Sequence, residues 1–157
     1  MATTTPARST ALDADRLHLS RVDRAMNATV RGFARVGISI QGTRILAVRG
    51  RNTGAWRTTV LNPITVGGER YLVAPRGETQ WVRNLRAARA GELRLGRRHE
   101  SVTVDEVPVD DRTTVLRAYL AAYGWSAGTY FAVDADSTDA ELAAAAPAHP
   151  VFHVTRT

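Results

Sequence analysis

Residues 49–87 read RGRNTGAWRTTVLNPITVGGERYLVAPRGETQWVRNLRA, and this stretch decides the expected fold. It predicts a strand, a turn, a second strand, a hairpin at Gly67-Gly68, a third strand, a loop and a helix. Two polar loops, residues 51–57 and 76–79, combine arginine, glycine and threonine. Guanidinium groups, hydroxyls and free backbone N–H groups near glycines suit a phosphate-bearing ligand, so we expect the two loops to face one anion-binding site.

Outward from this stretch, short apolar runs predict antiparallel strands. The expected strands are 45–49, 58–66, 70–74, 92–95, 100–107 and 151–155. Because Pro63 lacks an N–H group, its strand should lie at a sheet edge or bulge there. The expected helices are 20–37, 80–90, 111–123 and an alanine-rich helix ended by Pro147. About six antiparallel strands with few helices predict a small barrel rather than a doubly wound sheet.

The composition indicates a single domain. The chain has 157 residues, so we expect a Thr/Ser/Ala/Pro-rich, disordered segment at 1–14 and one domain over 15–157. There is no cysteine, which excludes disulfides and thiolate chemistry. No signal peptide or apolar run long enough to span a bilayer is visible, so a cytoplasmic protein is expected. The net charge of +6 permits nucleic-acid binding, but the 21 arginines are spread along the chain.

Several catalytic motifs are missing from the sequence. There is no G-x-G-x-x-G loop in a βαβ unit, no phosphate-binding P-loop pattern and no G-x-S-x-G elbow. The four histidines are His18, His99, His149 and His153, and only the last two are close in sequence. Pro150 lies between them in an expected strand, so structural or solvated histidines are favoured over a metal site.

Three motifs occur together in one order: Gly50-Arg51-Asn52-Thr53-Gly54, then Asn62-Pro63, then Trp81-Val82-Arg83-Asn84-Leu85-Arg86-Ala87. With these motifs at this spacing, residues 35–107 resemble the deazaflavin-dependent nitroreductase family. The resemblance implies a mainly β fold with flanking helices, a split β-barrel like that of FMN-binding proteins. It also implies that coenzyme F-420, an 8-hydroxy-5-deazaflavin, serves as the hydride carrier.

The resemblance further implies ligand contacts for particular residues. Those expected to bind the coenzyme's phosphate are Arg51, Asn52, Thr53, Gly54 and Arg57, with Asn52 standing where the family usually has lysine. Those expected to hold the phosphate or acidic tail from the opposite side are Arg76 and Gly77. Those expected along the deazaflavin ring are Thr59, Val60, Leu61, Asn62 and Pro63. Without the resemblance, arginines in such turns would equally suit a solvated surface.

The C-terminal third is expected to close the substrate pocket. Its aromatic residues are Tyr119, Tyr123, Trp125, Tyr130 and Phe131, clustered around Gly124 and Gly128. They suit either a glycine-hinged lid over a flat ligand or packing of a helix onto the barrel, and both readings stay open. Trp81 suits the core or the pocket wall, or else a substrate contact. Tyr130 or Tyr123 could donate a proton after hydride transfer, and Asn84 could brace the adjacent loop.

The function that follows from the resemblance is hydride transfer from reduced coenzyme F-420 to an electron-poor small molecule. An activated alkene, a quinone or a nitro compound would fit, in detoxification or natural-product tailoring. One alternative is a split barrel that binds FMN or a lipid-like ligand without deazaflavin chemistry. Another is a basic barrel that binds nucleic acid, which the scattered arginines disfavour. We expect no nucleic-acid partner, no membrane span and no metal, and either a monomer or a homodimer.

Overall fold

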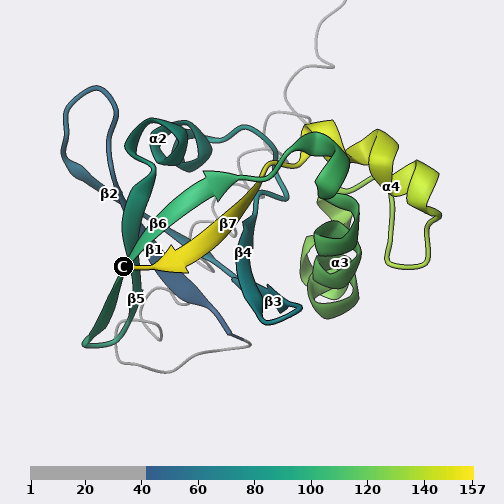
Figure 1. Ribbon diagram of the computed structural model, residues 1–157, viewed down its shortest axis with the longest axis horizontal. Helices are drawn as coiled ribbons and strands as arrows, with labels where there is room; N and C mark the ends of the chain where they lie inside the picture. The colour runs from purple at the N-terminus through teal and green to yellow at the C-terminus, as the bar shows by residue number, and fades with distance from the viewer. Residues whose placement is uncertain (1–41) are drawn as a thin grey trace, which may run out of the picture.

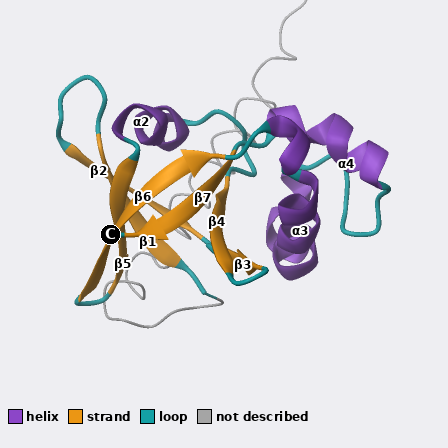
Figure 2. Ribbon diagram, viewed as in Figure 1, coloured by secondary structure: helices purple, strands orange, loops and turns teal. Residues whose placement is uncertain are grey.

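The computed structural model describes residues 42–157, which form one curled antiparallel sheet with flanking helices (Figures 1 and 2). The segment 1–14 and the helix expected at 20–37 lie outside the described residues, so these predictions and the single domain over 15–157 stay predictions. The strands are β1 (Arg44–Arg49), β2 (Trp56–Leu61), β3 (Ile64–Val66), β4 (Glu69–Val73), β5 (Ala90–Leu95), β6 (Arg98–Glu106) and β7 (Val151–Arg156).

Three α-helices and three short 3-10 turns accompany these strands in the described residues. The helices are α2 (Gln80–Ala88), α3 (Thr113–Ala127) and α4 (Asp139–Ala145). The 3-10 turns are η1 (Val109–Asp111), η2 (Gly128–Tyr130) and η3 (Ala146–Ala148). In Figure 1, α2 lies over one end of the curled sheet, α3 lies beside β3 and β4, and α4 packs against α3. Within residues 42–157, each helix is too short or too polar to cross a membrane.

The strand order explains why the sheet curls. The order is β2-β1-β5-β6-β7-β4-β3, with every neighbouring pair antiparallel, so β2 and β3 are its two edges. These two edges follow each other in the chain, joined only by Asn62 and Pro63. Because consecutive Cα atoms are about 3.8 Å apart, Leu61 and Ile64 lie within about 11 Å of each other. The sheet therefore closes on itself at this point, as the expected barrel requires.

The predicted single strand at 58–66 is wrong, because Asn62 and Pro63 divide it into β2 and β3. Pro63 has no N–H group to donate to a strand ladder. Asn62 is fixed instead by its side chain, whose Oδ1 accepts a hydrogen bond of 2.8 Å from the Thr43 hydroxyl. The break gives seven strands in place of the expected six. The strand before Pro63, β2, and the strand after it, β3, are both edge strands of the sheet. The expectation that Pro63 lies at a sheet edge is therefore confirmed.

The Gly67-Gly68 hairpin is confirmed. Its φ angles of +60° and +85° both lie in the left-handed region, as a two-residue turn between right-twisted strands requires. Val66 and Glu69 pair across the turn. The turn thus fixes the register of β4, which carries the chain back toward the second polar loop.

Apolar side chains pack on both faces of the sheet. Inside the curl, Leu46, Leu72 and Phe152 join Leu85 of α2 in one buried cluster. The residues next to Leu72 and Phe152 point the other way, since side chains alternate along a strand. A second buried cluster of residues therefore packs outside the curl against α3 and α4, with members Ile64, Val73, Val115, Leu116, Tyr119, Leu120, Ala127, Leu142, Ala146 and Val151.

Two helix boundaries differ from the prediction. The helix expected at 80–90 ends at Ala88, because Arg89 has a φ of +52° and residue 90 already begins β5. The helix expected at 111–123 instead runs from Thr113 to Ala127. Gly124 therefore lies inside α3 rather than in a loop after it, and the lid and packing readings of this stretch stay predictions. Gly128 ends the helix and begins η2.

Glu106, the last residue of β6, links α2 to the start of α3. Its carboxylate accepts hydrogen bonds of 2.7 and 2.8 Å from Arg86 of α2, and one of 3.0 Å from Arg112, the residue before α3. Arg112 is buried and also donates to the carbonyl oxygens of Val107 and Ala146. The bonds from Arg86, with both arginine charges nearby, hold the pKa of Glu106 below its usual range despite partial burial. One carboxylate thus holds two helices in place.

A glycine in β5 provides a test of the packing. A Cβ atom on Gly91 would lie 2.8 Å from the Ala47 carbonyl oxygen, whereas one on Gly124 would meet open space. We expect Gly91→Ala to lower the free energy of unfolding by about 1–3 kcal/mol through overpacking. Gly124→Ala should raise it by about 0.5–1 kcal/mol, because alanine is the better helix former. Urea unfolding of both variants measures this, and equal effects would contradict the packing described.

The Glu106 link predicts a pH dependence of stability. Because pairing lowers the pKa of Glu106 in the folded state, its contribution is fully present above about pH 4.5 and is lost as the pH falls through the folded-state pKa. Glu106→Gln should therefore destabilise the protein at pH 7, by about 2 kcal/mol. The deficit should shrink at pH 3. Urea unfolding at both pH values tests this, with Asp110→Asn, an exposed position, as control. A deficit independent of pH would contradict the prediction.

Candidate active site

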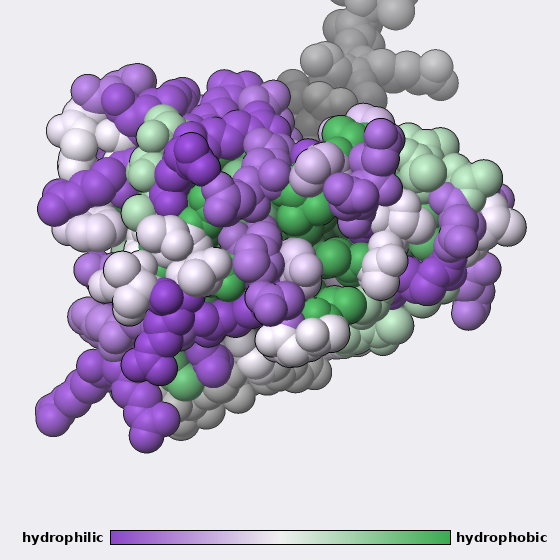
Figure 3. Space-filling model, in the orientation of Figure 1, coloured by the Kyte–Doolittle hydropathy of each residue, from purple (hydrophilic) through white to green (hydrophobic). Residues whose placement is uncertain are grey.

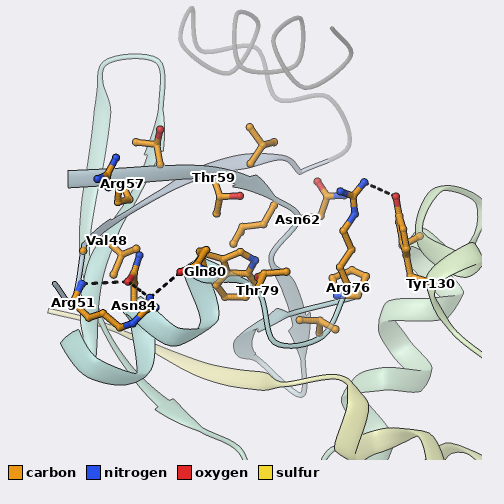
Figure 4. A pocket seen from close by; sticks show the side chains of 18 of the residues that line it. Val48, Arg51, Arg57, Thr59, Asn62, Arg76, Thr79, Gln80, Asn84 and Tyr130 are labelled. Carbon is orange, nitrogen blue, oxygen red and sulfur yellow. Dashed lines mark hydrogen bonds between the residues drawn. The ribbon is translucent and has the colours of Figure 1, made fainter. Parts of the chain in front are cut away.

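A cleft of about 840 Å³ opens along the edge strand β2, facing the first part of α2 (Figure 4). Most of its lining comes from four parts of the chain: the turn after β1, strand β2, the loop into α2 with the start of that helix, and the end of α3 with η2. Its volume is within the range of about 300–1,000 Å³ that small-molecule sites occupy. The two polar loops singled out in the sequence both contribute to it.

The described lining of the cleft is cationic. It contains three arginines, Arg51, Arg57 and Arg76, and neither aspartate nor glutamate. The N-terminal end of α2 also lies in the wall, where the helix dipole and unpaired N–H groups favour negative charge. With low-dielectric walls around them, these charges concentrate a positive potential in the cleft. Its ligand is therefore expected to carry negative charge.

Arg51 is held in place from α2. The Asn84 side chain is buried, and its Oδ1 accepts hydrogen bonds from the Arg51 backbone N–H at 3.2 Å and from Arg51 Nη1 at 3.0 Å. Gln80 Oε1 accepts a further bond from Arg51 Nη1 at 2.9 Å. Both acceptors are neutral amides, so they orient the guanidinium without neutralising its charge. The predicted role of Asn84 as a brace for the loop is confirmed.

Strand β2 presents backbone groups to the cleft. In the sheet it pairs with β1 alone, so alternate residues direct their N–H and C=O groups away from β1. Consecutive residues from Arg57 to Asn62 line the cleft, which is the pattern of a strand approached along its open edge. A flat ligand beside β2 could therefore form hydrogen bonds with the main chain.

Thr79 contributes a polar atom that is already removed from water. It precedes α2 in extended conformation, yet its side chain makes no capping hydrogen bond. Its Oγ1 is buried and has no hydrogen-bond partner among residues 42–157, while the residue lines the cleft. Buried hydroxyls without partners are rare and destabilising. A ligand with a polar group at this level of the cleft would satisfy it.

Arg76 and Tyr130 lie at the end of the cleft remote from Arg51 (Figure 4). Arg76 Nη2 donates a 2.5 Å hydrogen bond to the Tyr130 hydroxyl, and the guanidinium carbon lies 4.7 Å from the centre of the Tyr130 ring. Tyr119 also lines the cleft and is otherwise buried, and this burial, with a smaller contribution from Tyr123, raises the pKa of its hydroxyl. This end therefore combines the Arg76 cation with the Tyr130 phenol.

Most of the site residues predicted from the sequence come together in this cleft. They are Arg51, Asn52, Thr53, Arg57, Thr59, Val60, Leu61, Asn62, Arg76, Trp81, Tyr119 and Tyr130. Trp81 is half-buried and also packs against the core, with its ring 6.0 Å from that of Phe152, as expected for a pocket wall. Their roles toward a ligand remain predictions. The sequence analysis included Thr79 only as part of the second polar loop, and it assigned no ligand contact to Gln80.

Other predicted site residues do not line this cleft. They are Gly54, Pro63, Gly77, Tyr123, Trp125 and Phe131. Tyr123 donates a 3.4 Å hydrogen bond to the Pro63 carbonyl, and Phe131 stacks on His149 with ring centres 3.9 Å apart. Trp125 is 71% exposed on α3. Gly77 lines a second, shallower hollow on the other side of Arg76 and Tyr130. The aromatic cluster of the C-terminal third is thus divided between packing and cleft.

The described histidines do not form a metal centre. No group of three potential ligands occurs within residues 42–157. His149 is buried against Phe131, and burial lowers its pKa despite hydrogen bonds with backbone carbonyls. His153 lies 2.6 Å from a carboxylate oxygen of Glu69 on the sheet. These placements agree with the structural roles favoured in the sequence analysis, and His18 lies outside the described residues.

Solved structures place the fold among split-barrel proteins. An F420-H2-dependent reductase named FDR-A is 19% identical and superposes with a TM-score of 0.51, covering 73% of this chain and 94% of that one. A protein of unknown function from Agrobacterium tumefaciens gives 17% identity and a TM-score of 0.55, over 100% of this chain and 61% of that one. A putative pyridoxamine 5'-phosphate oxidase from Listeria innocua gives 8% identity and 0.50, over 73% and 83%. The class is therefore the split barrel of the pyridoxamine oxidase type.

The sequence gives the family within this class. The model of the F420H(2)-dependent quinone reductase family matches residues 19–144, and the chain belongs to that family. It is therefore an enzyme that uses coenzyme F-420 for reduction, as the resemblance in its motifs indicated. A search of curated proteins found no match to this sequence.

The cleft fits this coenzyme. A phosphate and an acidic tail require cations without competing carboxylates, and the described lining has three arginines and no acid. A flat ring with a polar edge requires hydrogen-bonding groups beside an apolar wall, which the open edge of β2 and Trp81 provide. Thr79, whose buried hydroxyl has no hydrogen-bond partner within residues 42–157, lines the same cleft.

The Asn84 brace gives a prediction. Asn84→Ala removes the acceptor of two hydrogen bonds from Arg51 and should lower the free energy of unfolding by about 1–3 kcal/mol. It should also weaken binding of oxidised coenzyme F-420, because Arg51 loses its orientation. Urea unfolding and fluorescence titration of the coenzyme measure the two effects. Asn52→Ala, at an exposed position of the same loop, should change stability by less than about 0.5 kcal/mol. Equal losses of stability in both variants would contradict the assignment.

Proposed function

We propose that this chain reduces electron-poor small molecules, namely quinones, activated alkenes such as enones, and nitro compounds, with hydride from reduced coenzyme F-420. The observation that best supports this is a single cleft that combines three arginines, no acid among its described residues and the open edge of a strand. Such an activity would serve detoxification or the tailoring of a natural product. The name of the family favours quinones among these acceptors.

The coenzyme's anionic part is assigned to the Arg51 end of the cleft. Arg51 and Arg57 would bind the phosphate and acidic tail, with backbone groups of the turn around Asn52 and Thr53. Thr59, Val60, Leu61 and Asn62 would lie along the ring, and their outward N–H and C=O groups would contact its polar edge. Arg51 is pre-oriented by Asn84 and Gln80, so little side-chain entropy is lost on binding.

The chain's own residues position the reaction rather than carry electrons. When bound, the reduced coenzyme supplies a hydride. The acceptor gains two electrons and one proton in that form, takes a second proton from a protein hydroxyl or from water, and leaves in its reduced form. Trp81 and the apolar residues of the wall would exclude water from the reacting face. Tyr130, which lines the cleft, is the better candidate for holding that proton at its hydroxyl oxygen than Tyr123, which does not.

The assay that tests the function uses the purified chain, reduced coenzyme F-420 and a panel of quinones, enones and nitroaromatics. Loss of the reduced coenzyme is followed by the return of the oxidised coenzyme's visible absorbance. Turnover of at least one acceptor class is expected, together with tighter binding of the deazaflavin than of FMN. Tighter binding of FMN than of the deazaflavin would contradict the proposal. Coenzyme binding without turnover of any acceptor would also contradict it. The mass of the complex in solution would also tell monomer from homodimer.

Arg57 allows the coenzyme assignment to be tested without turnover. It is exposed and lines the cleft, and its guanidinium makes no hydrogen bond or ion pair with the described residues, so Arg57→Gln should leave the fold intact. We expect the Kd of the oxidised coenzyme to rise by about tenfold through loss of one charge-assisted contact. Arg97→Gln, an exposed arginine in the turn between β5 and β6, is the matched control and should change the Kd by less than twofold. A rise of the same size in both variants would show that only net charge matters.

A further inference from the structure

Thr79 occupies the N-cap position of α2, yet its hydroxyl takes no part in holding the helix. The Thr79 backbone N–H donates a 2.9 Å hydrogen bond to the Gly77 carbonyl, and its carbonyl accepts a 3.2 Å bond from the Arg83 N–H. The backbone is thus paired on both sides, whereas Oγ1 is buried and has no partner among residues 42–157. A threonine at this position ordinarily accepts a bond from the first turn of its helix. The missing cap leaves the hydroxyl for another group.

The first turn of α2 has unused donors beside this hydroxyl. The backbone N–H groups of Gln80 and Trp81 have no acceptor within residues 42–157, and both residues line the cleft together with Thr79. N–H groups in a first turn have no partner inside the helix, and the helix dipole adds positive potential there. One hydroxyl and two N–H groups in a single wall suit an oxygen atom that accepts hydrogen bonds, above all one with negative charge.

No carboxylate competes for these donors in the described lining of the cleft. The acid next to Thr79 in the sequence is Glu78, whose carboxylate lies 2.6 Å from Arg86 Nη1, and neither residue lines the cleft. The partner of the Thr79 hydroxyl would therefore come from a bound ligand.

Thr79 lies at the level of the cleft assigned to the ring of the coenzyme. Figure 4 shows Thr79 and Gln80 between Arg51 and Arg76 on the α2 side of the cleft, and Thr59 on the β2 side. Gln80, its neighbour in the chain, accepts a hydrogen bond from Arg51 at the phosphate end. A change of χ1 rotamer exchanges the hydroxyl and methyl positions of a threonine, so the oxygen can meet a ligand without movement of the backbone.

We propose that the Thr79 hydroxyl and the N–H groups of Gln80 and Trp81 bind an oxygen atom of the coenzyme's ring system, which makes Thr79 a further coenzyme-binding residue. In the free chain the hydroxyl is already removed from water without compensation, so a hydrogen bond to the coenzyme recovers a cost that folding has incurred. This inference rests on the proposed function for the position of the ring, whereas the family supplies the coenzyme.

The test removes one hydroxyl at each of two N-cap threonines. Thr79→Val replaces the unpaired hydroxyl by a methyl group of similar size, and Thr79→Ser keeps the hydroxyl. Thr138→Val is the matched control, because Thr138 Oγ1 caps α4 by accepting a 3.2 Å hydrogen bond from the Glu141 N–H, and Thr138 does not line the cleft. Urea unfolding of the free chain measures stability, and fluorescence titration with oxidised coenzyme F-420 measures the Kd.

The two threonines should respond in opposite ways. Thr79→Val should raise the urea midpoint of the free chain, because no hydrogen bond is lost and an unpaired buried oxygen is removed. The same variant should raise the Kd of the coenzyme about tenfold, and Thr79→Ser should keep the Kd within about threefold of wild type. Thr138→Val should lower the urea midpoint through loss of its cap and leave the Kd within about twofold.

The outcomes separate this inference from the proposed reaction. An unchanged Kd in Thr79→Val overturns the inference, and so does a lower urea midpoint, since the hydroxyl would then have a partner in the free chain. The acceptor is the other source of an oxygen atom, so an unchanged Kd with a raised KM for a quinone overturns the inference and assigns Thr79 to the acceptor. If coenzyme binding depends on Thr79 but no acceptor is reduced, the proposed reaction fails and this inference stands.

Discussion

The architecture depends on one constraint of chain length: two residues, Asn62 and Pro63, connect the two edges of a seven-stranded sheet. A connection this short forces the edges together at one point, and the sheet curls to satisfy it. Pro63 cannot continue the ladder of β2, and the Thr43 bond to Asn62 fixes the crossing. Away from this point β2 keeps an unpaired edge, and the cleft opens along it. The interruption at Asn62 and Pro63 therefore both closes the curled sheet and leaves the β2 edge along which the cleft opens.

Neutral side chains of the cleft wall hold its charged side chains in place. Asn84 and Gln80 orient Arg51 through neutral amides, and Tyr130 orients Arg76 through a phenol. The acids near α2, in contrast, are paired with arginines that do not line the cleft, as Glu106 is with Arg86. The described lining therefore holds three arginines and no acid. Glu106 also connects α2, which carries the acceptors for Arg51, to Arg112, the residue before α3.

Local signals in the sequence predicted much of this structure. The hairpin at Gly67-Gly68 follows from backbone conformation, and the alternating Val102 and Val104 identify a strand with one buried face. The division of residues 58–66 was missed, because β-branched residues continue past Pro63 and conceal a change of sheet edge. Only the pairing of β2 with β1 and of β3 with β4, contacts far apart in sequence, reveals it. The extension of α3 through Gly124 was missed for a related reason, since packing against the barrel overrides the weak helix propensity of glycine.

The site was predictable in part. Motif spacing brought Arg51, Arg57 and Arg76 to one cleft, but no local pattern distinguishes its two ends, which depend on the partners Asn84 and Tyr130. The Thr79 hydroxyl shows a further consequence of this design. A buried oxygen without a partner in the described chain is a form of frustration in the free enzyme. A ligand that formed a hydrogen bond with this oxygen would gain affinity by relieving an existing defect rather than by adding an attraction.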